Sequence, residues 1–207
     1  SKINYRLTRG DLPGGSMQGN RREWSMGEAL QWVRAFREAH LRPKAAAGLT
    51  ITVANFKGGV AKTTTVLSLG AALSELGNRV LLIDLDAQAN LTLALGLEPG
   101  ETELTSSNVM LDNEAILNVS RKTEIPNLDL IPSSSRIETS EQFLPVRTNY
   151  TTILQRAIQS VVLPYDYIVL DCPPALGAIT RNALAAANLL LIPTQAEYFS
   201  AYALRNM

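Results

Sequence analysis

The stretch that decides the fold of this chain is Phe56-Lys57-Gly58-Gly59-Val60-Ala61-Lys62-Thr63-Thr64-Thr65. Its first residue ends the apolar, β-branched segment 49–56, which we predict to be a strand. Its last residues open the segment 63–76, which we predict to be a helix. A glycine-containing turn between a strand and a helix points backbone N–H groups and the positive end of the helix into one concavity. The stretch therefore predicts a phosphate-binding loop.

The side chains of this loop suit a nucleoside triphosphate with magnesium. Lys62 would reach the β- and γ-phosphates, and the Thr63 hydroxyl would hold Mg²⁺. The common pattern G-x-x-x-x-G-K-[ST] does not match, because Phe56 and Ala61 stand where it has glycine. Ala61 is small enough to keep the turn if its φ is negative. The alternative is an ordinary strand-to-helix turn with a lysine at the helix start.

Two acidic segments later in the chain argue against that alternative. Asp84 and Asp86 close the apolar segment 79–86, and Asp171 ends the apolar segment 167–171. We predict that both segments are strands. In parallel sheets, ligands bind at the carboxyl ends of the strands, where these carboxylates can support Mg²⁺ or orient a water molecule.

Alternating apolar segments continue this pattern along the rest of the chain. We predict further strands at 128–131 and 189–192, and helices at 140–162 (with a break at Pro145), at 179–188 and from Tyr198 onward. Buried strands that alternate with helices indicate a mainly parallel, twisted sheet with helices on both faces. The predicted fold class is α/β, of the P-loop nucleoside triphosphatase (NTPase) type.

Composition excludes several classes of protein. Hydrophobic residues make up 46% of the 207 residues, which is enough for a core and argues against general disorder. Cys172 is the only cysteine, so a disulfide within the chain is impossible. No apolar run reaches the roughly 18–20 residues that a membrane span needs. We expect a cytoplasmic protein without a membrane partner.

The distribution of charge divides the chain into two parts. Residues 1–48 carry nine Lys or Arg against four Asp or Glu, whereas residues 49–207 carry ten against fifteen. The first part contains a loop expected at 12–20 and a helix that begins after Ser25, with Glu28 completing a capping box. We predict a small basic helical extension over 1–48 and a nucleotide-binding domain over 49–207 that is incomplete at its C-terminal end.

These segments resemble a known family. Residues 57–64 are similar to the deviant Walker A motif, K-G-G-x-x-K-[ST]-[ST], of the ParA/MinD ATPases. Residues 84–90 resemble the D-x-D-x-Q-x-N switch I of that family, and residues 171–174 resemble its D-x-P-P switch II. The pattern at 84–90 favours ParA, the partition branch, over MinD. The resemblance implies ATP and Mg²⁺ as cofactors.

The resemblance also implies three catalytic residues. Lys62 would neutralise the phosphates of its own chain's nucleotide. Lys57 would reach across a nucleotide-sandwich dimer to the partner's phosphates, much as an arginine finger does. Asp86 would orient the attacking water.

Further residues would bind the metal and the nucleotide. Mg²⁺ would be supported by Thr63 and, through water, by Asp84 and Asp171. The nucleotide-binding residues would be Lys57, Gly58, Gly59, Val60, Ala61, Lys62, Thr63 and Thr64.

The function implied by the resemblance is DNA partition. The protein would be a weak ATPase that dimerises with ATP, binds DNA non-specifically and segregates plasmid or chromosomal DNA with a ParB-like partner, which would stimulate hydrolysis. Its location would be the cytoplasm, in association with the nucleoid. Two alternatives stay open: a nucleotide-switched autoregulator of its own operon, and a MinD-like membrane-associated positioning ATPase, which would need a C-terminal amphipathic helix.

The basic extension has its own resemblance. Residues 19–25 and the helix after them are similar to the wing and following helix of MerR-type winged helices, although residues 1–10 do not show the helix-turn-helix that should come first. The candidate DNA contacts are Arg21, Arg22, Arg34 and Arg37. The alternatives are a basic helix with solvated arginines and one packed face, and a helix that contributes to dimerisation.

Overall fold

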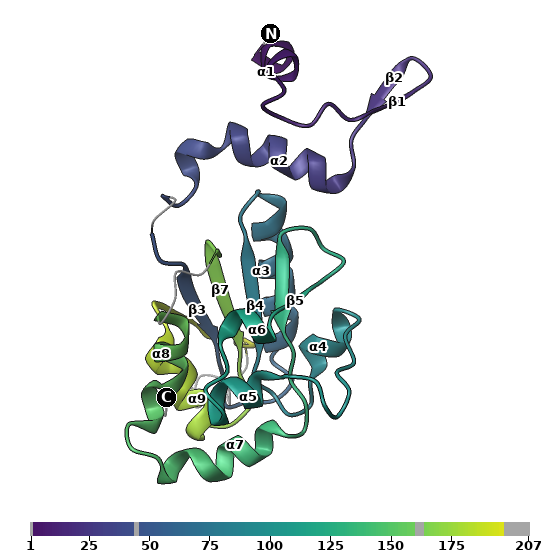
Figure 1. Ribbon diagram of the computed structural model, residues 1–207. Helices are drawn as coiled ribbons and strands as arrows, with labels where there is room; N and C mark the ends of the chain where they lie inside the picture. The colour runs from purple at the N-terminus through teal and green to yellow at the C-terminus, as the bar shows by residue number, and fades with distance from the viewer. Residues whose placement is uncertain (1, 44–45, 160–163, 197–207) are drawn as a thin grey trace.

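A six-stranded sheet forms the centre of the protein (Figure 1). The structure is a computed structural model that describes residues 2–43, 46–159 and 164–196. The strand order across the sheet is β5-β6-β4-β7-β3-β8, with bounds Arg121–Lys122, Leu128–Ile131, Val80–Asp84, Tyr167–Asp171, Leu49–Val53 and Leu189–Leu191. Neighbouring strands run parallel, except that β5 runs antiparallel to β6. The predicted α/β class with a mainly parallel sheet is confirmed.

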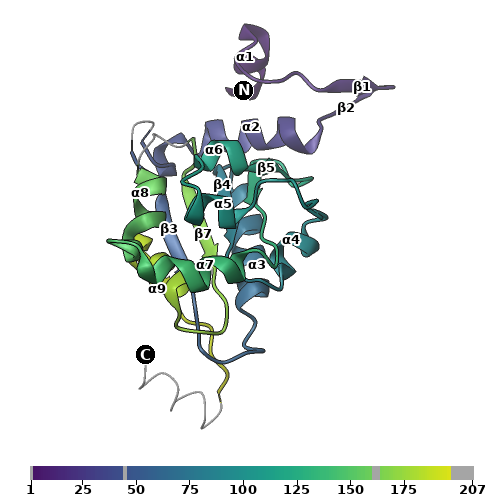
Figure 2. The ribbon, with the colours of Figure 1, turned by 60° about the horizontal axis from the view of Figure 1, so that its bottom comes forward.

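Two groups of helices cover the two faces of this sheet (Figures 1 and 2). One face carries α3 (Lys62–Glu75) and α4 (Asn90–Ala94). The other carries α5 (Ser106–Leu111), α6 (Ile116–Val119), α7 (Ile137–Phe143), α8 (Ile153–Gln159) and α9 (Ala178–Ala186). Successive residues of β4 point to opposite faces, so Leu82 joins the first layer while Leu81 and Ile83 join the second. Because both faces are covered, β4 is apolar without alternation.

Several elements differ in length from the prediction for local reasons. β6 and β7 have the predicted bounds. The strands predicted at 49–56 and 79–86 are shorter, because their last residues leave the sheet and form loops at its carboxyl edge. The break predicted at Pro145 is confirmed by two short 3-10 helices between α7 and α8, which are η2 (Leu144–Val146) and η3 (Tyr150–Thr152). The helix predicted from Tyr198 lies outside the described residues.

The first part of the chain contains more regular structure than its sequence indicates. Helix α1 (Lys2–Arg9) occupies a segment for which no helix is predicted. The loop expected over 12–20 is confirmed at 12–15 and in the turn at 19–20, but residues 16–18 form β1 (Ser16–Gln18), which pairs with β2 (Arg21–Glu23) in an antiparallel hairpin. Gly19 turns this hairpin with a φ of +60°, a conformation that glycine adopts at little cost.

Helix α2 (Met26–Phe36) follows the hairpin and ends in the 3-10 helix η1 (Glu38–His40). The predicted capping box is confirmed: the Ser25 hydroxyl accepts a hydrogen bond from the Glu28 N–H, and the Glu28 carboxylate accepts one from the Ser25 N–H. Figures 1 and 2 show α1 and the hairpin lying beyond α2, on its side away from the sheet. Among the described residues, no helix is both long enough and apolar enough to cross a membrane.

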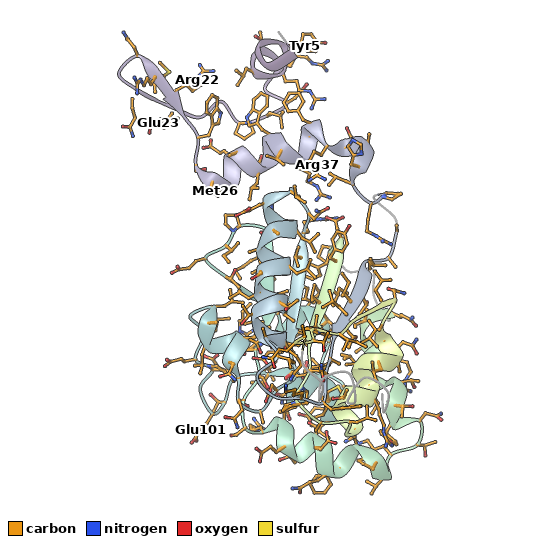
Figure 3. All side chains as sticks on the ribbon, turned by 180° about the vertical axis from the view of Figure 1, so that it is seen from behind. Tyr5, Arg22, Glu23, Met26, Arg37 and Glu101 are labelled. Atoms are coloured by element: carbon orange, nitrogen blue, oxygen red, sulfur yellow. The ribbon has the colours of Figure 1, made fainter. Side chains whose placement is uncertain are left out.

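Helix α2 is docked on the amino-terminal edge of the sheet through its arginines. The Arg34 guanidinium donates to the Asp166 carboxylate at 2.7 Å and to the Gly77 carbonyl at 2.6 Å. Arg37 donates to the Leu76 carbonyl at 3.0 Å, and Figure 3 shows its side chain on the side of α2 that faces α3. Arg34 and Arg37 therefore anchor the extension, and their assignment as candidate DNA contacts stays a prediction.

The buried carboxylate of Asp166 explains why this docking needs a cation. Asp166 is 4% exposed. Burial alone would raise its pKa, but hydrogen bonds from Arg34 and Arg79 hold the pKa below the ordinary value of 3.8. The carboxylate is therefore charged at neutral pH, and Arg34 supplies part of the compensation for its burial.

Candidate nucleotide-binding site

The predicted site residues meet at the carboxyl ends of three neighbouring strands. β7 lies between β4 and β3 in the sheet. Asp171 at the end of β7 is in register with Val53 at the end of β3 and with Asp84 at the end of β4. Neighbouring strands lie roughly 4.8 Å apart. The phosphate loop, which leaves β3, and the two acidic segments therefore share one edge of the sheet, opposite the edge that holds α2.

The phosphate loop contains a strained alanine. Ala61 has φ +62° and ψ +33°, which is the left-handed conformation, directly before the first residue of α3. The expectation of a negative φ is therefore wrong. A non-glycine residue pays roughly 1–2 kcal/mol for this conformation. Gly59, with φ +70°, adopts the same conformation within the same turn. After this strained residue the chain enters α3, whose first residue, Lys62, contacts the loop.

The loop closes around the Lys62 side chain. Lys62 is 8% exposed, and its ammonium donates a hydrogen bond to the Lys57 carbonyl at 3.2 Å. A bond from an ammonium to a phosphate oxygen is stronger than one to a neutral carbonyl, because both partners carry charge. An entering phosphate can therefore take this ammonium from Lys57 without leaving it unpaired.

Asp171 has the strongest unmet hydrogen-bonding capacity in the site. Both of its carboxylate oxygens are buried and accept no hydrogen bond from the described residues. Burial raises its pKa to about 7; the nearby Thr63 hydroxyl lowers it, the charges of Asp84 and Asp86 raise it, and Lys62 lowers it. Two buried oxygens without donors fit a cation that is bound directly or through water.

The remaining carboxylates of the site hold the loop that follows β4. Asp84 is fully buried and accepts hydrogen bonds from the Asp86 N–H at 3.0 Å and from the Thr92 N–H and hydroxyl at 3.0 and 2.7 Å. Burial raises its pKa, and those hydrogen bonds oppose the rise. One oxygen of Asp86 accepts from the Gln88 N–H at 3.0 Å, while its Oδ2 has no partner among the described residues. Asp86 thus has an oxygen left for a water molecule.

Magnesium fits these residues only together with a nucleotide. In the described part of the chain, no group of three or more His, Cys, Asp or Glu side chains is placed to hold a metal ion by itself. Mg²⁺ is usually held by one or two protein groups, several waters and substrate phosphates. The Thr63 hydroxyl and the Asp171 oxygens can supply the protein share. Both carboxylate oxygens of Asp84 accept hydrogen bonds from the loop that follows β4. Its predicted support of Mg²⁺ would therefore be indirect.

The raised pKa of Asp171 predicts how stability depends on pH without nucleotide or metal. The pKa is about 7 in the folded state against an ordinary value of 3.8. Folding therefore takes up a proton between these pH values, and the free energy of unfolding falls as pH rises through this window. Above pH 7 the buried charge costs about 4 kcal/mol.

The Asp171→Asn variant removes this penalty. We expect its melting temperature to exceed that of the wild type at pH 8, with a smaller difference at pH 5, in thermal melts with EDTA. Asp112→Asn, at an exposed carboxylate, is the control and should change little. A gap that stays constant or shrinks as pH rises would contradict the assignment of the charge to Asp171.

Comparisons with known proteins agree with this geometry. Residues 48–207 match the AAA_31 family, described as AAA domain. The sporulation initiation inhibitor protein Soj of Bacillus subtilis is 40% identical over 74% of this chain and 60% of its own length. A putative plasmid partition protein of Borrelia burgdorferi, solved bound to AMPPNP, is 31% identical over 78% of this chain and 68% of its own, with a TM-score of 0.69.

This chain belongs to the family of ParA-type partition ATPases. A further similar structure, a cobyrinic acid a,c-diamide synthase of Mycobacterium smegmatis with a bound ATP analogue and magnesium, is 37% identical over 77% of this chain and 66% of its own, with a TM-score of 0.71. The chain spans about three-fifths of the length of Soj. The ParA-type P-loop fold is thus shown, while the winged-helix interpretation of the extension stays a prediction.

Two residues that shape this ParA-type site were not predicted from the sequence. Asn55 is 3% exposed at the end of the β3 segment, where a polar residue in an apolar run was the only signal. Gln195 contacts the phosphate loop from 138 positions further along the chain, a separation that no local pattern reports. Cys172 is a buried free thiol whose pKa is raised by burial.

Proposed function

We propose that this protein binds ATP with Mg²⁺ and hydrolyses it as a partition ATPase. The observation that carries the proposal is the pair of buried, unpartnered oxygens of Asp171, beside Thr63 and Lys62 at the mouth of the phosphate loop. An acidic edge next to a basic loop suits a polyanion that arrives with a divalent cation. The family relatives bound to ATP analogues support the choice of nucleotide.

The residues of one chain would position the phosphates. The backbone N–H groups of 58–64 and the Lys62 ammonium bind the β- and γ-phosphates, while the Thr63 hydroxyl and Asp171 orient the metal–phosphate group. When bound, Mg²⁺ supplies positive charge to the phosphate oxygens. Asp86 accepts a hydrogen bond from the attacking water and aligns it with the γ-phosphate. Positioning and charge neutralisation therefore supply the catalysis.

A second copy of the chain would complete the charge balance. Lys57 is half-buried, and its ammonium donates a hydrogen bond to the Gln195 side chain of its own chain. In trans, its ammonium would neutralise charge on the partner's phosphates. Hydrolysis is then slow in the monomer and depends on the dimer.

The cellular task that fits best is the partition of plasmid or chromosomal DNA. The ATP-bound dimer would bind DNA non-specifically, and a ParB-like partner would stimulate hydrolysis and release it. The relatives named for sporulation inhibition and plasmid partition support this assignment. The location would be the cytoplasm, on the nucleoid.

The Lys57→Ala variant tests the dimer. In light scattering with Mg²⁺ and a slowly hydrolysed ATP analogue, we expect the wild type to move from monomer to dimer, while Lys57→Ala binds the analogue and stays monomeric. The control is Lys122→Ala, at a lysine on β5 whose ammonium is paired with Asp129 on β6, and it should dimerise normally. Unchanged dimerisation of Lys57→Ala would remove the role in trans.

A second candidate function is a nucleotide-switched regulator of its own operon, which the extension favours. Helix α1 carries Arg6 and Arg9, and the hairpin carries Arg21 and Arg22 on its exposed second strand. Figure 3 shows Arg22 on the hairpin, away from the sheet. A helix followed by a basic hairpin suits one contact in a DNA groove and one on the phosphates. Footprinting of the DNA upstream of its own coding sequence, with ADP present, distinguishes this function from non-specific binding.

A further inference from the structure

The loop that follows β8 is tied to the phosphate loop through Asn55. The Asn55 amide donates a hydrogen bond to the Pro193 carbonyl at 2.8 Å, and its oxygen accepts one from the Lys57 N–H at 3.0 Å. Asn55 is 3% exposed, so both hydrogen bonds are shielded from water and costly to break. The residues after β8 are thereby held next to the start of the phosphate loop.

Gln195 makes the next contact between the same two loops. Its carbonyl oxygen accepts a hydrogen bond from the Lys57 ammonium at 3.0 Å. Its amide nitrogen donates to the Gly59 carbonyl at 3.3 Å. One side chain therefore connects the ammonium of Lys57 to the backbone two residues further along the phosphate loop.

Within the part of the chain that the structure describes, these contacts hold Lys57 at three points. Asn55 holds its N–H, the Lys62 ammonium holds its carbonyl at 3.2 Å, and Gln195 holds its own ammonium. In this arrangement the Lys57 side chain lies against the loop of its own chain. A role in trans requires the ammonium to leave Gln195.

We propose that Gln195 is a positioning residue that retains Lys57 on its own chain until nucleotide binds, and so restrains dimerisation. This inference rests on the proposed role of Lys57 in trans. An arriving phosphate draws the Lys62 ammonium from the Lys57 carbonyl, which releases one of the three points. The contact with Gln195 must then be broken in each of the two subunits before the dimer closes.

The size of the restraint follows from the exposure of this contact. A solvent-exposed hydrogen bond to a charged group shifts an equilibrium by roughly three- to fivefold. Because both subunits release a lysine, the dimer association constant is lowered by roughly 10- to 25-fold. We expect the affinity of the monomer for ATP to change little, since Gln195 bonds the Lys57 ammonium and the Gly59 carbonyl and leaves the N–H groups of the phosphate loop to the nucleotide.

The experiment compares Gln195→Ala with Gln142→Ala, an exposed glutamine on α7, in the intact chain. Sedimentation with Mg²⁺ and a slowly hydrolysed ATP analogue measures the dimer association constant, and titration of dilute protein measures the monomer's nucleotide affinity. We expect Gln195→Ala to dimerise roughly 10- to 25-fold more tightly with unchanged nucleotide affinity, and Gln142→Ala to match the wild type. Gln195→Met, which keeps the volume without the hydrogen bonds, should behave as Gln195→Ala does.

The double variant Lys57→Ala/Gln195→Ala separates this inference from the proposed function. Its dimerisation should equal that of Lys57→Ala alone, because Gln195 acts only through Lys57. If Gln195→Ala dimerises as the wild type does, or more weakly, while Lys57→Ala is monomeric, the restraint is refuted and the trans role stands. If Lys57→Ala dimerises normally, the trans role fails first.

Discussion

The Lys62→Ala variant is expected to lose ATP binding. Lys62 is 8% exposed, and its ammonium is the one buried ammonium at the mouth of the phosphate loop among the described residues. Two charge-assisted hydrogen bonds to phosphate oxygens are worth about 3–5 kcal/mol, so we expect affinity to fall by roughly 100-fold or more. Titration with a fluorescent ATP analogue measures this loss.

Folding controls make that result specific. In the nucleotide-free state the Lys62 ammonium donates to the Lys57 carbonyl, so its removal leaves one loop carbonyl to find another donor. We expect a normal far-UV circular dichroism spectrum for Lys62→Ala. Lys122→Ala changes the same kind of side chain away from the site and should bind normally. Micromolar affinity retained by Lys62→Ala would overturn the assignment of the site.

The Asp86→Ala variant is expected to separate binding from hydrolysis. The Asp86 side chain has one oxygen left for water, and a group that positions a reacting proton contributes roughly 100- to 10,000-fold to a rate. We expect ATP binding close to that of the wild type, phosphate release reduced by roughly 100-fold or more, and a dimer that persists with ATP itself. Phosphate release and light scattering measure these effects.

The control for this variant is Glu98→Ala, at a carboxylate away from the site. Asp86 also accepts a hydrogen bond from the Gln88 N–H, so Asp86→Asn, which keeps an acceptor there, tests whether loop structure alone explains the loss. We expect Asp86→Asn to hydrolyse as poorly as Asp86→Ala. Normal hydrolysis by either variant would show that another group orients the water.

Local patterns were sufficient for the order of the parallel strands and for the position of the phosphate loop. The apolar segment that became β7 is continuous because both faces of the sheet are covered, and such an unbroken run can be recognised from neighbouring residues alone. The capping box at Ser25 could be predicted because its two partners are only three residues apart. The glycines, lysines and carboxylates of the site follow their strands directly, so their spacing already indicated a phosphate site.

Some properties that the local pattern missed depend on residues far apart in the chain. The position of Arg34 on α2 indicates a basic helix, but its ion pair with Asp166 spans 132 positions and anchors the extension to the sheet. Ala61 adopts a left-handed φ directly before α3, which its sequence neighbours do not reveal.

The chemistry of the site likewise depends in part on local sequence and in part on tertiary contacts. The alternation of strands and turns is written in consecutive residues, because each element is formed by contacts within a few positions, and this places Lys62 and Asp171 at one edge of a sheet. The protonation state and the hydrogen-bond partners of the site's side chains depend on how the folded chain packs around them. Burial beneath neighbouring strands raises the pKa of Asp171 to about 7, and Gln195 reaches Lys57 across 138 positions. Charge and hydrogen bonding respond to whatever lies nearby in space, and that arrangement exists only once the chain has folded.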